Sequence, residues 1–298
     1  MNGEGATSPT LLVTGAAGLL GEEVARLAEG EYELYRHFHR PPSSPAHPNC
    51  FAGDLGDLNH ARELAGKIDP DIIINCAALA DVDRCQREPE LSERVNVLAV
   101  EYLLRVFPRA KFVHISTDLV FPQGKKPPLP NDPTAPLNTY GHHKLAGEQV
   151  VRAKSLDNLI VRTNTMYSHT HQRNFFCFVY SALRAGEKIS GIIDQSSNPL
   201  TAFSAAQLVL QLVGKNAKGI FHIGGQEHVS RYEFACRIAD YFHLDRSLIS
   251  PVTSASFERV APRLLIGGLD CRETDKFLGV RMPSIESDLA RIRERITL

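Results

Sequence analysis

Apolar residues along this chain form two kinds of segment, short continuous runs and longer stretches with helical spacing. The first run covers residues 10–14 and leads into a glycine-rich turn. Apolar side chains then recur at helical spacing at Leu19, Leu20, Val24 and Leu27. The pattern predicts a strand, a tight turn and a helix near the start of the chain.

The same alternation continues through the first half of the chain. Further strands are predicted at 32–40, 71–78, 111–117 and 158–163. Helices are predicted between them at 58–69, at 91–107 and from about Tyr140. Strands that alternate with helices pair in parallel through right-handed crossovers. The order therefore predicts an α/β fold with a doubly wound, Rossmann-type parallel sheet.

The pattern changes after Tyr167. A polar segment is followed by a predicted helix at 175–184, a strand at 219–225 and a helix at 230–242. Roughly the last fifty residues have short apolar runs broken by prolines, which indicates a small helix-rich lobe. We expect a dinucleotide-binding domain at 9–164 and a smaller C-terminal substrate lobe at 165–298, with part of 188–224 returning to the sheet.

Composition narrows the class of protein. The 298 residues are 43% hydrophobic, and 33 Lys and Arg nearly balance 34 Asp and Glu, which argues against disorder and against nucleic acid or an anionic membrane as partners. The stretch Met1 to Thr10 is polar, and no apolar run is long enough to span a membrane. Six cysteines are scattered singly, as is typical of reduced thiols. These features predict a cytoplasmic protein.

The turn after the first strand carries the spacing Gly15, Gly18 and Gly21, with Leu19 and Leu20 between the last two. Glycine at a strand-to-helix turn allows a tight bend and a close approach of the backbone to a pyrophosphate. The helix N-terminus then supplies amide donors to the phosphates. This turn predicts a dinucleotide cofactor.

The end of the second predicted strand indicates which dinucleotide. NAD-selective proteins place a carboxylate about 20 positions beyond the glycines, whereas this chain has Phe38, His39 and Arg40 there. A guanidinium suits a 2′-phosphate, so NADP(H) is favoured and NAD(H) remains possible. A solvated Arg40 without a cofactor role is the alternative. Asp54 and Leu55 are candidates for the adenine edge.

Residues Cys76, Ala77 and Ala78 follow a buried strand and are expected beside the nicotinamide riboside. Cys76 is interpreted as a small packing residue rather than a nucleophile. The histidines, including His169 and His171, have no companion ligands at metal-binding spacing, so we predict no metal site.

Three residues predict the chemistry. Tyr140 and Lys144 are four positions apart at the start of a helix, so they share one face and place an ammonium beside a phenol. A phenol becomes an acid–base group near neutral pH when a nearby cation stabilises its anion. Thr117 ends a strand at the carboxyl edge of the sheet, where its hydroxyl could hold a substrate carbonyl for hydride attack.

The chain resembles the extended short-chain dehydrogenase/reductases and, among them, the dTDP-4-dehydrorhamnose reductases. The resemblance rests on "LLVTGAAGLLG", "VHISTDLVF", "PLNTYGHHKLAGE", "LIVRTNTMY", "DQSSNPLTA" and "LDCRETDKFLG". It implies a sheet that binds NADP(H), a sugar-nucleotide lobe, and catalytic positions at Thr117, Tyr140 and Lys144. It also implies that Asp118 lies next to the sugar and that Asn174, Gln195 and Arg263 contact the nucleotide.

Two departures and a second resemblance leave the function open. Family members usually carry an aromatic residue at the position of Leu119 and a tryptophan at that of Thr165. The chain is also similar to the regulatory beta subunit of methionine adenosyltransferase in "GLLG", in Cys76 and in "LDC". The predicted function is an NADPH-dependent reductase of a nucleotide-linked 4-keto-6-deoxysugar; the alternative is an NADP(H)-binding regulatory subunit. A homodimer and a regulatory partner protein are both left open.

Overall fold

A seven-stranded parallel sheet forms the centre of the protein. The computed structural model describes residues 8–41 and 49–296, so the ends of the chain and part of the expected loop between Pro41 and Pro48 lie outside the described residues. The strands are β1 (Thr10–Thr14), β2 (Glu33–Phe38), β3 (Cys50–Ala52), β4 (Ile72–Asn75), β5 (Lys111–Thr117), β6 (Leu159–Thr163) and β11 (Gly219–His222).

The order of strands across the sheet is β11-β6-β5-β4-β1-β2-β3. The order in which the chain adds strands to the sheet therefore reverses at β1, which lies between β2 and β4. In open α/β sheets, ligands bind outside the carboxyl ends of the strands at such a switch point. The topology places the glycine turn after β1, the 76–78 segment after β4 and Thr117 at the end of β5 at one edge.

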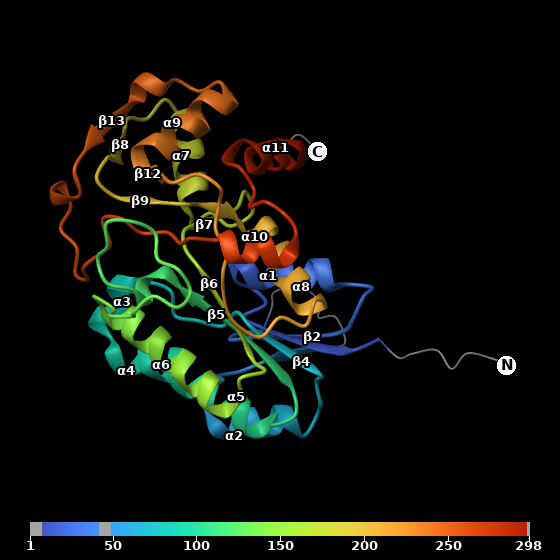
Figure 1. The fold of residues 1–298 in the computed structure, drawn as a ribbon. Helices are drawn as coiled ribbons and strands as arrows, with labels where there is room; N and C mark the ends of the chain where they lie inside the picture. The colour runs from blue at the N-terminus through green and yellow to red at the C-terminus, as the bar shows by residue number, and fades with distance from the viewer. Residues whose placement is uncertain (1–7, 42–48, 297–298) are drawn as a thin grey trace.

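Helices cover both faces of the sheet (Figure 1). Leu11 and Val13 of β1 pack with α1 (Leu19–Ala28) and α8 (Ala202–Gly214), while Leu12 faces the opposite core. That opposite core includes buried residues from α2 (Leu58–Ala65), α5 (Ala99–Val106) and α6 (Thr139–Lys154). Burial on both faces explains why the strands are continuous apolar runs.

A third apolar core lies beyond the carboxyl edge of the sheet. It joins Phe176 of α7 (Phe175–Arg184), Phe234 of α9 (Arg231–Phe242) and Leu289 of α11 (Ile285–Ile296). Three two-stranded ladders accompany these helices: β7 (Met166–Tyr167) with β10 (Leu200–Thr201), β8 (Ile189–Ile192) with β13 (Ile249–Val252), and β9 (Ser196–Ser197) with β12 (Val229–Ser230). Figure 1 shows α7, α9 and α11 on this side of the molecule.

The doubly wound parallel sheet is confirmed, and several details differ from the sequence prediction. The single helix predicted at 91–107 is divided into α4 (Pro89–Glu93), a π-helical turn (Arg94–Leu98) and α5. The short strand β3 and the short helix α3 (Val82–Arg87) were not predicted. The helix α10 (Arg272–Leu278) packs on β11, and its Phe277 contacts the ring of Phe221.

A buried ion pair holds α6 against the sheet. Glu148 of α6 and Arg162 of β6 are 2% and 3% exposed and meet at 2.6 Å. The Arg162 Nε donates to Glu148 Oε1 at 2.8 Å, and the Ser116 hydroxyl donates to the same oxygen at 2.5 Å. Removing one member of such a pair leaves an uncompensated buried charge.

We expect Arg162→Met to lower the free energy of unfolding by about 3–5 kcal/mol, because Glu148 loses its buried partner. Urea denaturation followed by circular dichroism measures the change. Arg109→Met is the matched control, since the Arg109–Asp69 pair is 82% and 70% exposed and such pairs contribute about 0–1 kcal/mol. Equal losses in the two variants would contradict a stabilising role for the buried pair.

Candidate active site

A cavity of about 620 Å³ opens at the carboxyl edge of the sheet, between the sheet and the apolar core formed by α7, α9 and α11. Of the residues that the sequence predicted for cofactor, catalysis or substrate, the lining contains Gly18, Leu19, Leu20, Cys76, Ala78, Thr117, Asp118, Tyr140, Lys144 and Asn174. Gln195 and Arg263, expected from the resemblance, line it as well. Segments far apart in the sequence therefore meet in one cavity.

The glycine turn forms the floor of this cavity beside β1. Gly15 has φ +64°, a conformation that favours glycine, and a Cβ there would lie 2.7 Å from the amide nitrogen of Ala77. The Gly18 amide donates to the Gly15 carbonyl at 2.8 Å. A Cβ on Gly21 would overlap that same carbonyl oxygen. The close contacts among Gly15, Gly21 and Ala77 thus determine the shape of the turn, although these three residues do not line the cavity themselves.

Tyr140 and Lys144 are both buried on the inner face of α6. The cap of this helix is the Asn138 side chain, whose Oδ1 accepts from the Gly141 amide at 2.8 Å. Burial raises the pKa of Tyr140 above its ordinary value, with Cys85 and Asp118 as further causes.

The expected lowering of the Tyr140 pKa by Lys144 is not found among the contacts of the described residues. Instead, the Lys144 Nζ lies 3.2 Å from His114 Nε2. Burial lowers the pKa of Lys144 to about 8, which Glu148 and Cys76 partly oppose. The Cys76 thiol has a pKa raised by burial to about 12, so it is protonated near neutral pH. A protonated phenol and a largely charged lysine therefore share the cavity wall near neutral pH.

Thr117 and Asp118 lie at the end of β5. The Thr117 hydroxyl donates to Asp118 Oδ1 at 3.2 Å and accepts from the Leu119 amide at 3.2 Å. Asp118 Oδ2 accepts from the Gly268 amide at 2.8 Å, and burial raises the pKa of this carboxyl. These contacts fix the hydroxyl of Thr117 at the cavity wall.

Other predicted cofactor residues do not line this cavity. Phe38 and Leu55 are buried in the apolar cores on opposite faces of the sheet. Asp54 pairs with Arg94 at 3.0 Å and accepts from the Gly56 amide. His39 and Arg40 are exposed at the end of β2, so their relation to a cofactor stays a prediction.

Asn174 has a structural contact that the sequence analysis did not anticipate. It caps α7, because its Oδ1 accepts from the Cys177 amide at 3.3 Å, and its Nδ2 donates to the Ser168 carbonyl at 2.9 Å. Its side chain thus holds the start of α7 at the rim of the cavity.

Sequence reasoning missed two arginines of the cavity, Arg173 and Arg231. Arg231 begins α9 and lies over the ring of Phe175, with its guanidinium carbon 5.5 Å from the ring centre. Burial, Arg259 and Arg263 lower the pKa of Arg231, so several cations face one another. The only signal in the sequence was a single arginine at the start of an aromatic-rich helix, and core packing of its apolar side chains explained that helix adequately.

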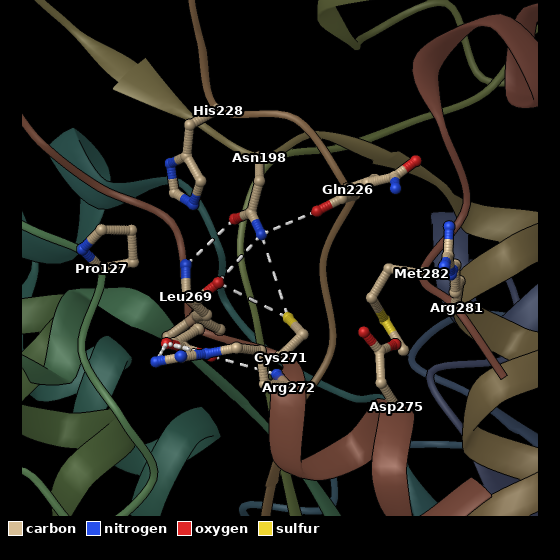
Figure 2. Close-up of a pocket in the computed structure, with 12 residues that line it drawn as sticks. Pro127, Asn198, Gln226, His228, Leu269, Cys271, Arg272, Asp275, Arg281 and Met282 are labelled. Atoms are coloured by element: carbon tan, nitrogen blue, oxygen red, sulfur yellow. Dashed lines mark hydrogen bonds and ion pairs between the residues drawn. The ribbon is translucent and has the colours of Figure 1, made fainter. Parts of the chain in front are cut away.

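A second cavity of about 380 Å³ lies behind the 196–198 segment (Figure 2). Asn198 forms the partition: its Nδ2 donates to the carbonyls of Gly225 and Leu269 at 3.0 Å, and its Oδ1 accepts from Asn164 of the main cavity at 2.8 Å. Arg272 pairs with Asp270 at 2.6 Å at the rim. The Asn198 side chain thus connects the wall of the main cavity with the wall of the second cavity.

The chain matches the family model described as the RmlD substrate binding domain over residues 9–298. It belongs to this family. Among curated relatives, it is 33% identical to the probable low-salt glycan biosynthesis reductase Agl14 of Haloferax volcanii, covering 94% of this chain and 96% of the relative. It is 31% identical to methionine adenosyltransferase 2 subunit beta of Xenopus laevis, over 91% of this chain and 84% of that one.

Solved structures of the RmlD family have the same fold. The dTDP-4-dehydrorhamnose reductase of Bacillus anthracis, solved in complex with NADP, superposes with a TM-score of 0.86 at 27% identity. The alignment covers 97% of this chain and all of that one. The predicted membership among NAD(P)-dependent oxidoreductases of this family is confirmed.

Two further features concern residues 8–41 and 49–296 alone. Within these ranges, no helix is long and apolar enough to cross a membrane. No group of three or more His, Cys, Asp or Glu side chains in the same ranges is arranged to hold a metal ion. His171, one of the histidines considered for metal binding, lies 2.7 Å from Glu22.

We expect Gly21→Ala to weaken NADPH binding about tenfold to a hundredfold, because the new methyl group would push α1 away from the glycine turn. Isothermal titration calorimetry measures the affinity. The control is Gly214→Ala at the end of α8, where an added Cβ meets nothing within 4 Å. Unchanged NADPH affinity in Gly21→Ala would argue against nucleotide binding at this turn.

Proposed function

We propose that the protein is an NADPH-dependent reductase of a nucleotide-linked 4-keto-6-deoxysugar, with Tyr140 as proton donor. The observation that carries this proposal is that one cavity joins the glycine turn after β1 to Thr117, Tyr140 and Lys144. The relatives named as reductases, and the NADP complex of one of them, support the same chemistry.

The residues present fit a dinucleotide. Cβ atoms at Gly15 and Gly21 have no room, as a tight turn and close packing of α1 require, and Gly18 lines the cavity where the backbone would approach a pyrophosphate. When bound, NADPH supplies a hydride to the substrate carbonyl. Cys76 and Ala78 lie along the wall where its nicotinamide half is expected, and Arg40 would face the 2′-phosphate.

Arginines in the outer part of the cavity support a nucleotide-linked substrate. Arg173, Arg231 and Arg263 line that part and all come from the C-terminal lobe, and Arg263 also pairs with Asp83 of α3 at 3.0 Å. Guanidinium groups bind phosphate oxygens through paired hydrogen bonds, so this cluster suits a diphosphate. Leu119 and Thr165 also line the cavity, where they leave more room beside the sugar than the aromatic residues usual in the family.

The side chains divide the reaction between them. Thr117 would turn its hydroxyl from Asp118 to donate a hydrogen bond to the substrate carbonyl, which holds that carbonyl beside Tyr140. Burial keeps the Tyr140 phenol protonated, so it can deliver a proton to the developing alkoxide. Lys144, one helical turn away on the same face, would favour the tyrosinate that remains, an effect smaller than the burial that raises the Tyr140 pKa in this structure. We assign cofactor binding to 9–164 and substrate binding to 165–298. Two elements of the second range are excepted: β11 is a strand of the sheet, and α8 packs beside α1 on one face of it.

A regulatory role is the second candidate. It is favoured by the similarity to methionine adenosyltransferase 2 subunit beta and by Leu119 and Thr165 in the cavity. Mixing the protein with a methionine adenosyltransferase catalytic chain on size-exclusion chromatography tests it. A stable complex with altered kinetics of that chain would support regulation, and separate elution would count against it.

We expect Tyr140→Phe to lower kcat for NADPH oxidation with dTDP-4-keto-6-deoxysugars by about a hundredfold to ten-thousandfold, the usual contribution of a general acid. The absorbance of NADPH is followed in the presence of each sugar nucleotide. Tyr102→Phe on α5 is the control, because it removes a phenol outside the cavity. Full activity in Tyr140→Phe would remove Tyr140 from the mechanism.

We expect Arg40→Ala to weaken NADPH binding about tenfold to a hundredfold and leave NADH binding unchanged, because only NADPH carries the 2′-phosphate. Calorimetric titration with both cofactors measures this, and Arg62→Ala on the exposed side of α2 is the control. Parallel losses for NADPH and NADH would show that Arg40 does not select the cofactor.

A further inference from the structure

A continuous row of buried polar groups lies behind Lys144. Its Nζ is 3.2 Å from His114 Nε2, and His114 Nδ1 is 3.3 Å from the Asn75 amide nitrogen. The Thr14 hydroxyl donates to Asn75 Oδ1 at 2.6 Å and accepts from the Ala77 amide at 3.3 Å. Thr14 and His114 are fully buried, and Asn75 and Lys144 are 2% exposed.

This row follows the register of the sheet. Thr14 of β1 lies opposite Asn75 of β4, and Asn75 lies opposite His114 of β5. One position earlier on each strand, the residues are the aliphatic Val13, Ile74 and Val113. Polar side chains at three adjacent positions across a buried sheet are costly unless they bond one another. They therefore form a single rigid unit.

The unit connects the glycine turn to the catalytic helix. Thr14 directly precedes Gly15, and Ala77 packs against that glycine. At the other end, Gly147 allows α6 to come close, since a Cβ there would lie 3.2 Å from His114 Nε2 and 2.9 Å from the carbonyl of Asn96. That close approach lets Lys144 reach His114.

The proton arrangement depends on the charge of Lys144. A charged ammonium only donates, so Nε2 must then accept and the imidazole proton must lie on Nδ1. The Asn75 amide is then turned, so that its oxygen accepts from Nδ1–H and its nitrogen donates to the Thr14 hydroxyl oxygen. A neutral lysine can accept from Nε2–H, and Nδ1 then accepts from the Asn75 amide nitrogen. Burial lowers the pKa of His114 well below its ordinary value, so the imidazole is neutral in both arrangements.

Two titratable groups, Glu148 and Cys76, favour the charge of Lys144 without a hydrogen bond to it among the described residues. Glu148 of α6 pairs with Arg162, and the Cys76 thiol at the end of β4 is protonated. Several groups on the neighbouring elements face other partners: Cys85 and Asp118 act on Tyr140, Glu93 acts on His143, and Arg94 pairs with Asp54. His114 is therefore the acceptor that the structure provides for the Lys144 ammonium.

We propose that His114 is a positioning residue for the reaction: its Nε2, anchored through Asn75 and Thr14, accepts a hydrogen bond from Lys144 and keeps that lysine charged and directed along the cavity wall. The role in turnover rests on the proposed reductase function, whereas the effect on Lys144 itself does not. His114 touches no substrate and acts through Lys144 alone.

The direct test is the titration of Lys144, observed by NMR in protein with labelled lysine and assigned with Lys144→Met. Burial sets the native pKa at about 8. His114→Leu removes the acceptor, which disfavours the ammonium, so the pKa of Lys144 should fall further by about one to two pH units. His114→Gln, whose amide oxygen reaches the Nε2 position, should restore most of the native value.

Two matched variants separate this effect from a loss of packing. His114→Asn keeps a polar group but reaches only the Nδ1 position, so it should behave like His114→Leu. His222→Leu removes another fully buried imidazole from β11, two strands away, and should leave the Lys144 titration unchanged. If His114→Leu does not fold, the comparison of the Gln and Asn variants decides. An unchanged Lys144 titration in the Asn and Leu variants would overturn the proposal.

The second readout is the pH profile of kcat/KM with NADPH and the 4-keto sugar nucleotide. The ammonium is lost as pH rises through the pKa of Lys144, so the alkaline limb should move to lower pH in His114→Leu and return in His114→Gln. A shift of the NMR titration in a protein without turnover would support the contact and reject the reductase function. Turnover with an unmoved alkaline limb would reject the role of His114 in the reaction.

Discussion

The candidate site depends on a charged contact that holds α6 to the sheet. The buried face of this helix consists mainly of glycines and polar residues, and Val151 is its aliphatic member. Glu148 therefore supplies the attachment, through Arg162 of β6 and Ser116 of β5. A buried carboxylate tolerates little displacement from its partner, because the attraction must offset the desolvation of both charges. Since Glu148 lies one turn after Lys144, the pair also fixes the rotation of the helix and the directions of its inner side chains.

That attachment requires unusually close packing. A Cβ on Gly141 would overlap the carbonyl oxygen of Leu119, and a Cβ on Gly147 would press on the π-helical turn and on His114. The π-helical turn is in turn held by Asn96, whose side chain accepts from the Leu79 amide and donates to its carbonyl. Backbone of two segments and the side chain of His114 thus confine α6. The reacting groups are placed by the sheet and by these approaches, with little freedom left to their own side chains.

The sequence predicted the parts of this arrangement that local patterns encode. Apolar periodicity identified the main strands and helices, and the spacing of glycines identified the tight turn between β1 and α1. The π-helical turn at 94–98 escaped because a single turn of i→i+5 hydrogen bonds between two helical segments has no marker in the apolar spacing. Arg231 escaped for a different reason: its place in the cavity follows from how the C-terminal lobe folds over the sheet, which no local spacing records.

The charge distribution of the cavity explains why the two parts of the protein have different tasks. Near the sheet, Asp118 accepts from a backbone amide, burial keeps Tyr140 protonated, and the charged Lys144 contacts His114. In the outer part of the cavity, burial and neighbouring cations lower the pKa of Arg231, so keeping this side chain positively charged costs free energy. An anionic ligand offsets that cost and a neutral carbonyl compound does not. In the proposed function, the sheet would therefore carry the acid–base chemistry, and the lobe would favour molecules that bring phosphate.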